Sequence, residues 1–190
     1  MPRTPDPKKR EKIIELSIKS FCEKGFRDTS IKDIAELSGV APGTVYTYFN
    51  DKKELYYEAI NQIWNQFFQS LDKILNENSE VVEALNKGYE LASNIIMMSY
   101  HLIKDMFTNK IRQKILTANL TKIANILTRY LVKNHGNNSY FSEDYETLTC
   151  KIEIFLYGAF FQLAFSELDE FNQIREKQKK AFQSILHGEK

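Results

Sequence analysis

Apolar residues recur every three or four positions along most of the 190-residue chain, which is the spacing of one face of an α-helix. All four prolines lie within the first 42 residues, so no ring-locked residue interrupts a helix after Pro42. We therefore expect an all-α fold of about nine helices. The clearest helical patterns cover residues 7–24, 31–38, 42–49, 52–75, 79–98, 116–131, 143–167 and 171–186.

The shortest of these segments lie close together, within residues 30–49. Ser30 is followed three positions later by Asp33, a weak form of the capping box that begins a helix, and Gly39 stands where that helix would end. Pro42 suits the first position of the next helix, where a backbone N–H is not needed. A short helix, a glycine-containing turn and a second short helix are the outline of a helix-turn-helix.

The helix that begins at Pro42 is expected to have two unlike faces, because successive residues are 100° apart around its axis. Val45 and Phe49 share the face expected to pack on the preceding helices. The opposite face and its flanks are small, hydroxylated or aromatic and carry Gly43, Thr44, Thr47, Tyr46 and Tyr48. Such a face suits insertion beside a phosphate-lined groove.

Charge and composition add little to this picture. The net charge of +1 gives no overall basic field, although residues 1–12 hold five basic and two acidic side chains. The basic residues are Arg3, Lys8, Lys9, Arg10 and Lys12. Such a segment can contact phosphates or be an ordinary solvated terminus. A second basic stretch, residues 104–133, is explained adequately by a solvated helix face, with an anionic effector or an auxiliary DNA contact as the alternative.

Several functional classes find no support in the sequence. Cys22 and Cys150 are far apart without CxxC spacing, which indicates neither a disulfide framework nor a zinc site. The chain has no HExxH, no GxSxG and no glycine-rich phosphate loop, so we expect no enzyme activity, no cofactor and no metal. The longest apolar stretch, residues 154–166, is shorter than the ~20 residues of a membrane span. A cytoplasmic protein is expected.

Residues 29–55, TSIKDIAELSGVAPGTVYTYFNDKKEL, resemble the DNA-binding signature of tetracycline-repressor (TetR) family transcription regulators. The resemblance implies a homodimer that binds a pseudo-palindromic operator, with the helix from Pro42 in the major groove of each half-site. It also implies two domains, a DNA-binding domain over residues 7–67 and an effector-binding and dimerisation domain over residues 68–190. The matching positions are Phe21, Gly25, Phe26, Thr29, Ile34, Ala35, Gly39, Val40, Gly43, Thr44, Tyr46, Phe49, Lys52 and Leu55.

The resemblance also assigns roles to individual side chains. It places Pro42, Gly43, Thr44, Thr47 and Tyr48 on bases or the adjacent backbone, and Thr29, Tyr46 and Lys52 on phosphates. Alternatives remain for three of them: Tyr46 can be a core residue, Thr29 a helix cap and Lys52 a solvated charge. Because the outer face has no Arg, Gln or Asn, we expect readout through thymine methyl contacts of Thr44 and Thr47, a contribution from Tyr48, and DNA shape.

In the family, the larger domain holds an effector pocket among its middle helices and a dimer interface on its last two. Candidates for a largely apolar pocket are Trp64, Phe68, Tyr89, Met97, His101, Phe107 and Tyr130, each of which can equally be plain core. Residues 154–161 are apolar around most of a helix, which favours burial against a second subunit over an ordinary core helix. Candidates for the interface are Phe155, Gly158, Ala159, Gln162 and Phe182.

Together these features predict a homodimeric transcription regulator, with repression adopted as the family's usual mode. The expected partners are operator DNA, a second copy of the chain and a small, largely apolar effector that releases the repressor from its operator. The alternative is a constitutive DNA-binding or architectural protein that has no effector.

Overall fold

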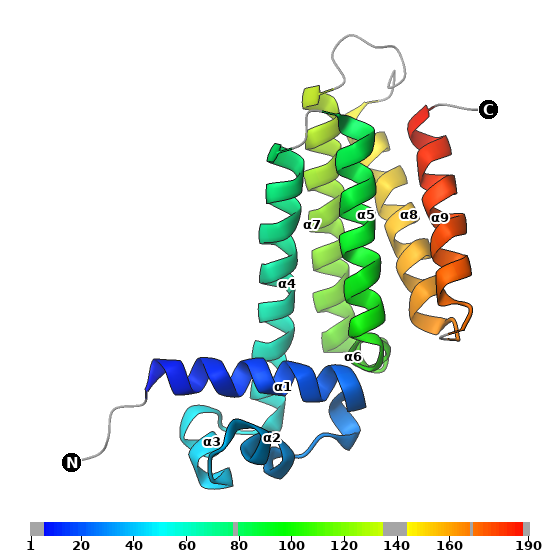
Figure 1. The fold of residues 1–190 in the computed structure, drawn as a ribbon. Helices are drawn as coiled ribbons and strands as arrows, with labels where there is room; N and C mark the ends of the chain where they lie inside the picture. Colours follow the sequence, from blue (N-terminus) through cyan, green and yellow to red (C-terminus); the bar gives the residue numbers. More distant parts are fainter. Residues whose placement is uncertain (1–5, 78–79, 135–143, 168, 188–190) are drawn as a thin grey trace. The chain divides into compact units, whose positions relative to one another are not determined.

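A computed structural model describes residues 6–77, 80–134, 144–167 and 169–187, with side chains to residue 182. Within these residues the chain forms nine helices and no strand (Figure 1), which confirms the all-α prediction. The helices are α1 (Pro7–Asp28), α2 (Ile31–Ser38), α3 (Pro42–Tyr48), α4 (Lys52–Glu77), α5 (Val81–Met98), α6 (Tyr100–Met106), α7 (Lys110–Asn134), α8 (Tyr145–Phe165) and α9 (Phe171–His187).

Two differences from the sequence pattern concern the middle of the chain. The pattern did not locate α6, whose seven residues are too few to repeat an apolar face. It also placed the start of α7 at residue 116, whereas the helix begins at Lys110. The helix extends to Asn134, three residues beyond the predicted pattern of residues 116–131, and residues 135–143 lie outside the described part of the chain.

The chain divides into two compact units. Residues up to 67 and residues 98–105 form the N-terminal unit, and residues 68–97 with those from 106 onward form the C-terminal unit. A single domain over residues 68–190 was expected, so the assignment of 98–105 to the N-terminal unit is a difference. Its cause is local packing: Leu102 and Ile103 are buried, and the Tyr56 hydroxyl lies 3.5 Å from the carbonyl oxygen of Leu102.

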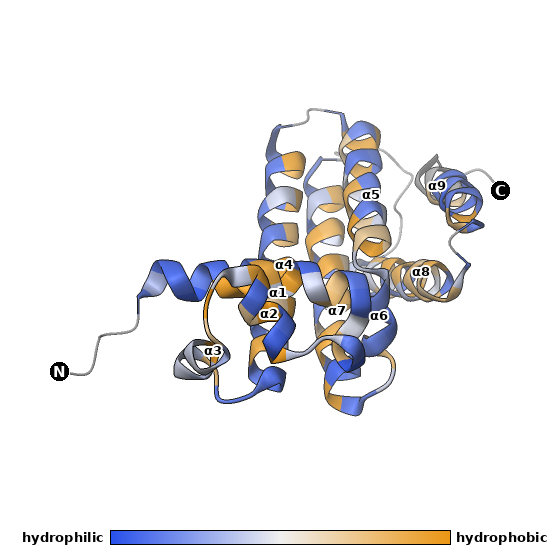
Figure 2. Cartoon of the chain, turned by 60° about the horizontal axis from the view of Figure 1, so that its bottom comes forward, coloured by the Kyte–Doolittle hydropathy of each residue, from blue (hydrophilic) through white to orange (hydrophobic). Residues whose placement is uncertain are grey.

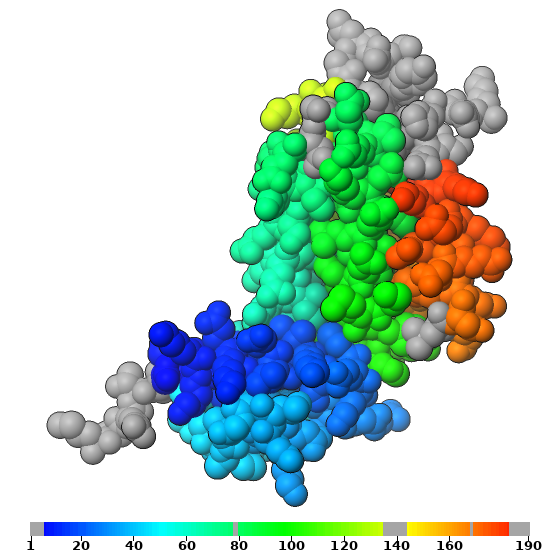
Figure 3. All heavy atoms as spheres, viewed as in Figure 1, coloured from blue at the N-terminus to red at the C-terminus, as the bar shows by residue number. Residues whose placement is uncertain are grey.

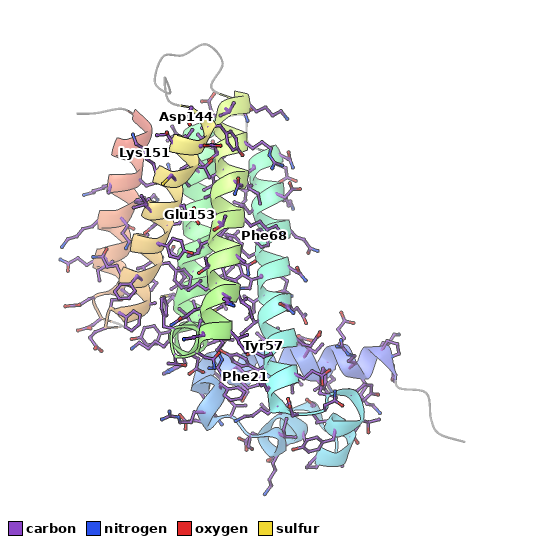
Figure 4. All side chains as sticks on the ribbon, turned by 180° about the vertical axis from the view of Figure 1, so that it is seen from behind. Phe21, Tyr57, Phe68, Asp144, Lys151 and Glu153 are labelled. Atoms are coloured by element: carbon purple, nitrogen blue, oxygen red, sulfur yellow. The ribbon has the colours of Figure 1, made fainter. Side chains whose placement is uncertain are left out.

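Aromatic rings form the centre of the N-terminal unit. The Tyr56 ring meets Phe21 edge-on, with centroids 5.0 Å apart, and Phe26 in a similar way at 4.9 Å. Phe21, labelled in Figure 4, is fully buried, as are Ile13 on α1 and Ile34 on α2. This core attaches α1 and α2 to the start of α4.

A break in α1 occurs at Gly25, whose φ of 76° and ψ of 177° are not helical. The helical pattern of residues 7–24 predicted that the helix would end just before Gly25. Instead the helical turns resume and continue to Asp28, and the backbone N–H of Phe26 donates a hydrogen bond to the Asp105 carboxylate of α6. The break is therefore held by a side chain 79 positions away in the sequence.

The C-terminal unit is a helical bundle of the second part of α4 with α5, α7, α8 and α9, in which α9 packs on α8 (Figure 1). Leu120 and Ile123 of α7 and Ile152 of α8 are buried. Polar bonds also join these two helices: the Thr121 hydroxyl donates to Glu153, which Figure 4 labels on α8. The pair α7–α8 is therefore held by both apolar burial and specific hydrogen bonds.

One face of α8 is left uncovered by the residues that the structure describes. Ile154, Phe161 and Phe165 expose 67%, 56% and 49% of their surface, and Gly158 between them is exposed as well. Their spacing of three and four residues places all of them on one side of the helix. By length and composition alone α8 is also apolar enough to cross a membrane, and only 28% of its most apolar window is buried. Counting only residues 154–166, an apolar stretch that includes Gln162, underestimated the apolar length of this helix.

Candidate nucleic-acid interface

The helix α2 is fixed at both ends by the groups that the sequence indicated. The backbone N–H of Asp33 donates to the Ser30 hydroxyl and that of Ser30 to the Asp33 carboxylate, both at 3.1 Å, so the capping box is confirmed. These hydrogen bonds hold the pKa of Asp33 below its ordinary value. At the other end Gly39 is left-handed, with φ 68° and ψ 34°, and the N–H of Val40 reaches the Ala35 carbonyl at 2.9 Å. The turn that leads to α3 is thereby set.

The helix α3 has the two faces that the sequence predicted. Val45 and Phe49 are buried, at 0% and 1% exposure, whereas Pro42 and Gly43 are exposed. Tyr46 exposes 55% of its surface, which excludes the alternative that it is a core residue of this chain. In Figure 2 α3 is coloured near the middle of the hydropathy scale, in contrast to the strongly polar start of α1. The outer surface of α3 is therefore accessible and only weakly polar.

The two threonines of α3 differ in their surroundings. The Thr47 hydroxyl donates to the Gly43 carbonyl one turn earlier, at 3.1 Å, and the side chain is exposed. Because the hydroxyl donor is engaged with its own helix, Thr47 can offer an outside partner its methyl group and the acceptor lone pairs of its oxygen. Thr44 is half-buried, and its backbone N–H donates to the Ala41 carbonyl at 2.8 Å.

Tyr48 makes a contact that sequence reasoning missed. Its hydroxyl accepts a hydrogen bond of 3.0 Å from the backbone N–H of Asp6, which lies 42 positions earlier and caps α1. The side chain is half-buried rather than fully displayed on the outer face of α3. No local signal could have indicated this pairing, because it depends on how α1 crosses the end of α3.

The predicted phosphate contact of the Thr29 side chain is not supported. Thr29 is only 1% exposed, and its hydroxyl lies 2.8 Å from the Gly25 carbonyl and 3.2 Å from the Ser20 carbonyl. It also accepts from the Ser20 hydroxyl at 3.3 Å. Its oxygen therefore ties the end of α1 together, which is closer to the alternative of a capping role.

Lys52 makes contacts within the protein that neither of the roles considered for it includes, and its phosphate contact stays a prediction. Its ammonium donates to the carbonyls of Phe26 and Thr29, at 2.8 and 2.9 Å, and lies 4.3 Å from the centre of the Phe26 ring. The side chain is half-buried, so it is not a simple solvated charge. With two of its three donors used inside the protein, Lys52 primarily fastens the break in α1 to the start of α4.

Replacement of Lys52 by Met should therefore lower stability even in the absence of DNA. We expect the free energy of unfolding to fall by about 1–2 kcal/mol, because two carbonyls lose a charged donor while the apolar stem is retained. Urea unfolding followed by circular dichroism measures this loss. Lys53→Met is the matched control, since Lys53 is the exposed neighbour. Equal stability of the two variants would contradict a structural role for Lys52.

The residues proposed for an effector pocket are distributed over both units. Trp64 and His101 belong to the N-terminal unit, where His101 is exposed on α6 beside Gly25. Met97 is also exposed, at the end of α5. The other four are half-buried in the C-terminal unit, and they are Phe68, Tyr89, Phe107 and Tyr130.

The half-buried members of this set have defined neighbours. The Tyr89 hydroxyl lies 2.9 Å from Oε1 of Gln178 on α9, and burial raises its pKa. The Phe68 ring lies beneath the ammonium of Lys122, at 3.8 Å, and Phe107 packs against the rings of α8. An effector pocket lined by the four half-buried side chains therefore stays a prediction. The exposure of Met97 and His101 counts against a place for these two residues in such a pocket.

The residues proposed for the dimer interface also differ among themselves. Gly158 and Gln162 are exposed on α8. Phe182 is buried, and its ring stacks on Phe155 with centroids 5.1 Å apart. The carbonyl of Ala159 accepts a hydrogen bond from Gln178 of α9 at 3.2 Å. Phe155, Ala159 and Phe182 thus serve the contact between α8 and α9 of the same chain. The exposed Ile154, Phe161 and Phe165 were not named as single candidates, although Ile154 and Phe161 lie in the apolar stretch 154–161.

In the described part of the chain no group of three His, Cys, Asp or Glu side chains is placed to hold a metal ion. The arrangement around α3 offers an accessible surface for binding. The inner side of α3 is packed on the protein and its outer side is accessible. The basic start of α1 is attached to the end of α3.

Comparison with known proteins agrees with this geometry. Residues 13–59 match the family model for bacterial regulatory proteins of the tetR family. The chain is 28% identical over 80 residues to the uncharacterized HTH-type transcriptional regulator YhgD of Bacillus subtilis, which is 42% of each chain. It is 26% identical over 85 residues to the HTH-type transcriptional repressor KstR2 of Mycolicibacterium smegmatis, or 45% of this chain and 41% of that one.

The match to these curated relatives therefore spans about two fifths of their length. Similarity of fold extends further. A transcriptional regulator structure from Saccharomonospora viridis in complex with choline superposes with a TM-score of 0.71 at 16% identity, over 94% of this chain and 97% of that one. The helix-turn-helix region, residues 13–59, therefore matches the tetR family of bacterial regulatory proteins, and the chain shares the all-α fold of a solved transcriptional regulator.

Proposed function

We propose that the protein is a cytoplasmic, homodimeric repressor that binds operator DNA and is released by a small-molecule effector. The proposal rests on the two unlike faces of α3. The inner face is buried through Val45 and Phe49, and the exposed outer face consists of Pro42, Gly43, Tyr46 and Thr47. A helix of this kind enters the major groove of a half-site, and a two-fold dimer reads two half-sites. Repression is supported by the name of the related KstR2.

In this proposal the exposed face of α3 reads bases without paired hydrogen bonds. The Thr47 methyl group contacts thymine, and its hydroxyl donor is already used by the Gly43 carbonyl. Pro42 and Gly43 let the backbone approach the groove closely, and the Tyr46 hydroxyl reaches a phosphate. Thr44, being half-buried, contributes less surface than Thr47.

The dimer is supported by the uncovered face of α8. Ile154, Gly158, Phe161 and Phe165 form a continuous apolar strip, which a second copy of the same helix would cover. Gly158 has no heavy atom within 4 Å of where a Cβ would stand, so there is room for a partner helix to approach. The same strip explains the apolar composition of α8 without a membrane.

The effector is assigned to the C-terminal unit, near the half-buried Phe68, Tyr89, Phe107 and Tyr130. The related fold solved with choline supports binding of a small molecule by such a bundle. The alternative is a constitutive DNA-binding or architectural protein. Titration of candidate ligands against the dimer–operator complex separates the two, because repeated failure to lower operator affinity favours the alternative.

Selection of duplexes from a random library tests the DNA-binding proposal directly. We expect an inverted repeat with thymines opposite Thr47, and an affinity that falls steeply with salt because bound phosphates release counterions. Thr47→Ser, which removes only the methyl group, should weaken binding about 4-fold per half-site, the equivalent of one buried methylene. An invariant guanine opposite Thr47, contacted directly in a complex, would contradict the readout, and no enrichment of any duplex would contradict the function.

A further inference from the structure

The start of α1 is attached to the end of α3 at two points. The Tyr48 hydroxyl accepts from the backbone N–H of Asp6 at 3.0 Å, and the Arg10 guanidinium lies 5.1 Å from the centre of the Phe49 ring. Asp6 and Arg10 are four residues apart and so lie on the same side of α1. The first turn of α1 is therefore held in a fixed position relative to the helix proposed to enter the groove.

Two lysines lie on this turn and are free to contact a partner. Lys8 and Lys9 are exposed, and neither pairs with a carboxylate in the part of the chain that the structure describes. Arg10, by contrast, is neutralised by Glu58 at 3.1 Å. Figure 3 shows this start of α1 on the surface of the N-terminal unit, and Figure 2 shows it as strongly hydrophilic. Arg3, also part of the basic segment, lies outside the described residues.

We propose that Lys8 and Lys9 contact the phosphate backbone that flanks the site read by α3, and that Tyr48 is the positioning residue that holds them there. The partner is duplex DNA, because the two charges continue the proposed DNA-binding face and complement its phosphates. Tyr48 acts through its bond to Asp6 rather than by reading a base. The inference rests on the proposed function and extends the site beyond the recognition helix.

Asp6 links Tyr48 to the turn that carries the two lysines. Its backbone N–H is bound to the Tyr48 hydroxyl, and its carboxylate accepts from the Lys8 backbone N–H at 3.0 Å. Removal of the phenolic oxygen breaks the first bond and leaves the second, so the helix remains capped while its attachment to α3 is weakened. Tyr48→Phe is therefore a mild change that tests position rather than folding.

The salt dependence of binding to a selected duplex distinguishes this role from a direct one. The double variant Lys8→Gln/Lys9→Gln should flatten the slope of log K against log salt by about 0.9 for each phosphate that a lysine no longer neutralises. Tyr48→Phe should flatten it in the same direction. A Tyr48 hydroxyl that merely donates to a base or phosphate would weaken binding without changing the slope, because a neutral donor releases no counterion.

A double-mutant cycle completes the experiment. In the Lys8→Gln/Lys9→Gln background, Tyr48→Phe should have little further effect on affinity, since the lysines that it positions are gone. Lys19→Gln, an exposed charge further along α1, and Tyr57→Phe, a half-buried tyrosine on α4 labelled in Figure 4, are the matched controls and should keep the wild-type slope. Circular dichroism confirms that each variant is folded.

Each outcome decides the inference. The inference is supported if the slopes of log K against log salt are flattened and the double-mutant cycle is non-additive. Unchanged slopes, or fully additive effects of the two changes, overturn it while the proposed function stands, because the wild-type protein still binds its duplex. A wild-type protein that binds no duplex overturns the proposed function and this inference with it.

Discussion

Gly25→Ala is expected to destabilise the N-terminal unit by about 3 kcal/mol or more. The backbone at Gly25, with φ 76° and ψ 177°, lies in a region that is essentially restricted to glycine, and a side chain there costs of order 1–3 kcal/mol. A Cβ would also stand 3.1 Å from Oδ2 of Asp105, the carboxylate that accepts the Phe26 N–H. Displacement of that carboxylate removes a charge-assisted hydrogen bond, which adds about 1.5–3 kcal/mol.

Thermal and urea unfolding, followed by circular dichroism, measure the effect. Gly43→Ala is the control within the same unit, because Gly43 lies in α3 and no heavy atom stands within 4 Å of its Cβ position. That change should leave stability unaltered or raise it by about 0.5–1 kcal/mol, as alanine favours helix more than glycine does. If Gly25→Ala and Gly43→Ala unfolded alike, the break in α1 would not require glycine.

The helix-turn-helix could be predicted from sequence because its signals are local. Ser30, Asp33, Gly39 and Pro42 act on backbone groups within a few residues of themselves, and each of them stands at the helix end that it was expected to form. The inner face of α3 follows from helical periodicity alone. Fold class and the position of α2 and α3 therefore needed no knowledge of tertiary contacts.

Side-chain roles in the same region could not be predicted, because they depend on distant partners. Lys52 bonds to carbonyls 23 and 26 positions away, and Tyr48 to a backbone N–H 42 positions away. A family motif records that a lysine or threonine belongs at a position, but not whether it faces DNA or the protein. For Thr29 and Lys52 the structure shows side-chain contacts within the protein.

The same limit applies to α8. Its composition showed that the helix needs cover on more than one side, but not which residues a neighbouring helix of the same chain would use. Phe182 and Phe155 stack on each other within the chain, and the buried Gln178 binds the Ala159 carbonyl and the Gln162 side chain. Only after those contacts are known does the remaining surface of α8 stand out as uncovered.

Ile154→Glu is accordingly expected to separate the proposed dimer. Ile154 is the most exposed apolar side chain of the strip, so its replacement should leave the fold of the single chain intact. Burial of a side chain of this size on association contributes about 1.5–3 kcal/mol, and a two-fold interface contains it twice. A carboxylate in its place would also have to be buried unpaired. The dissociation constant of the dimer should rise at least ~100-fold, or by about 2.7 kcal/mol.

Analytical ultracentrifugation over a range of protein concentrations measures this shift. Phe161→Glu tests the same strip one helical turn further along, and Val132→Glu, at an exposed apolar position of α7, is the matched control that should stay dimeric. Because each monomer carries only one recognition helix, the α8 variants should also lose affinity for a two-half-site duplex more than for a single half-site. Dimers of wild-type strength in both α8 variants would place the interface elsewhere on the molecule and leave the apolar strip of α8 without an occupant.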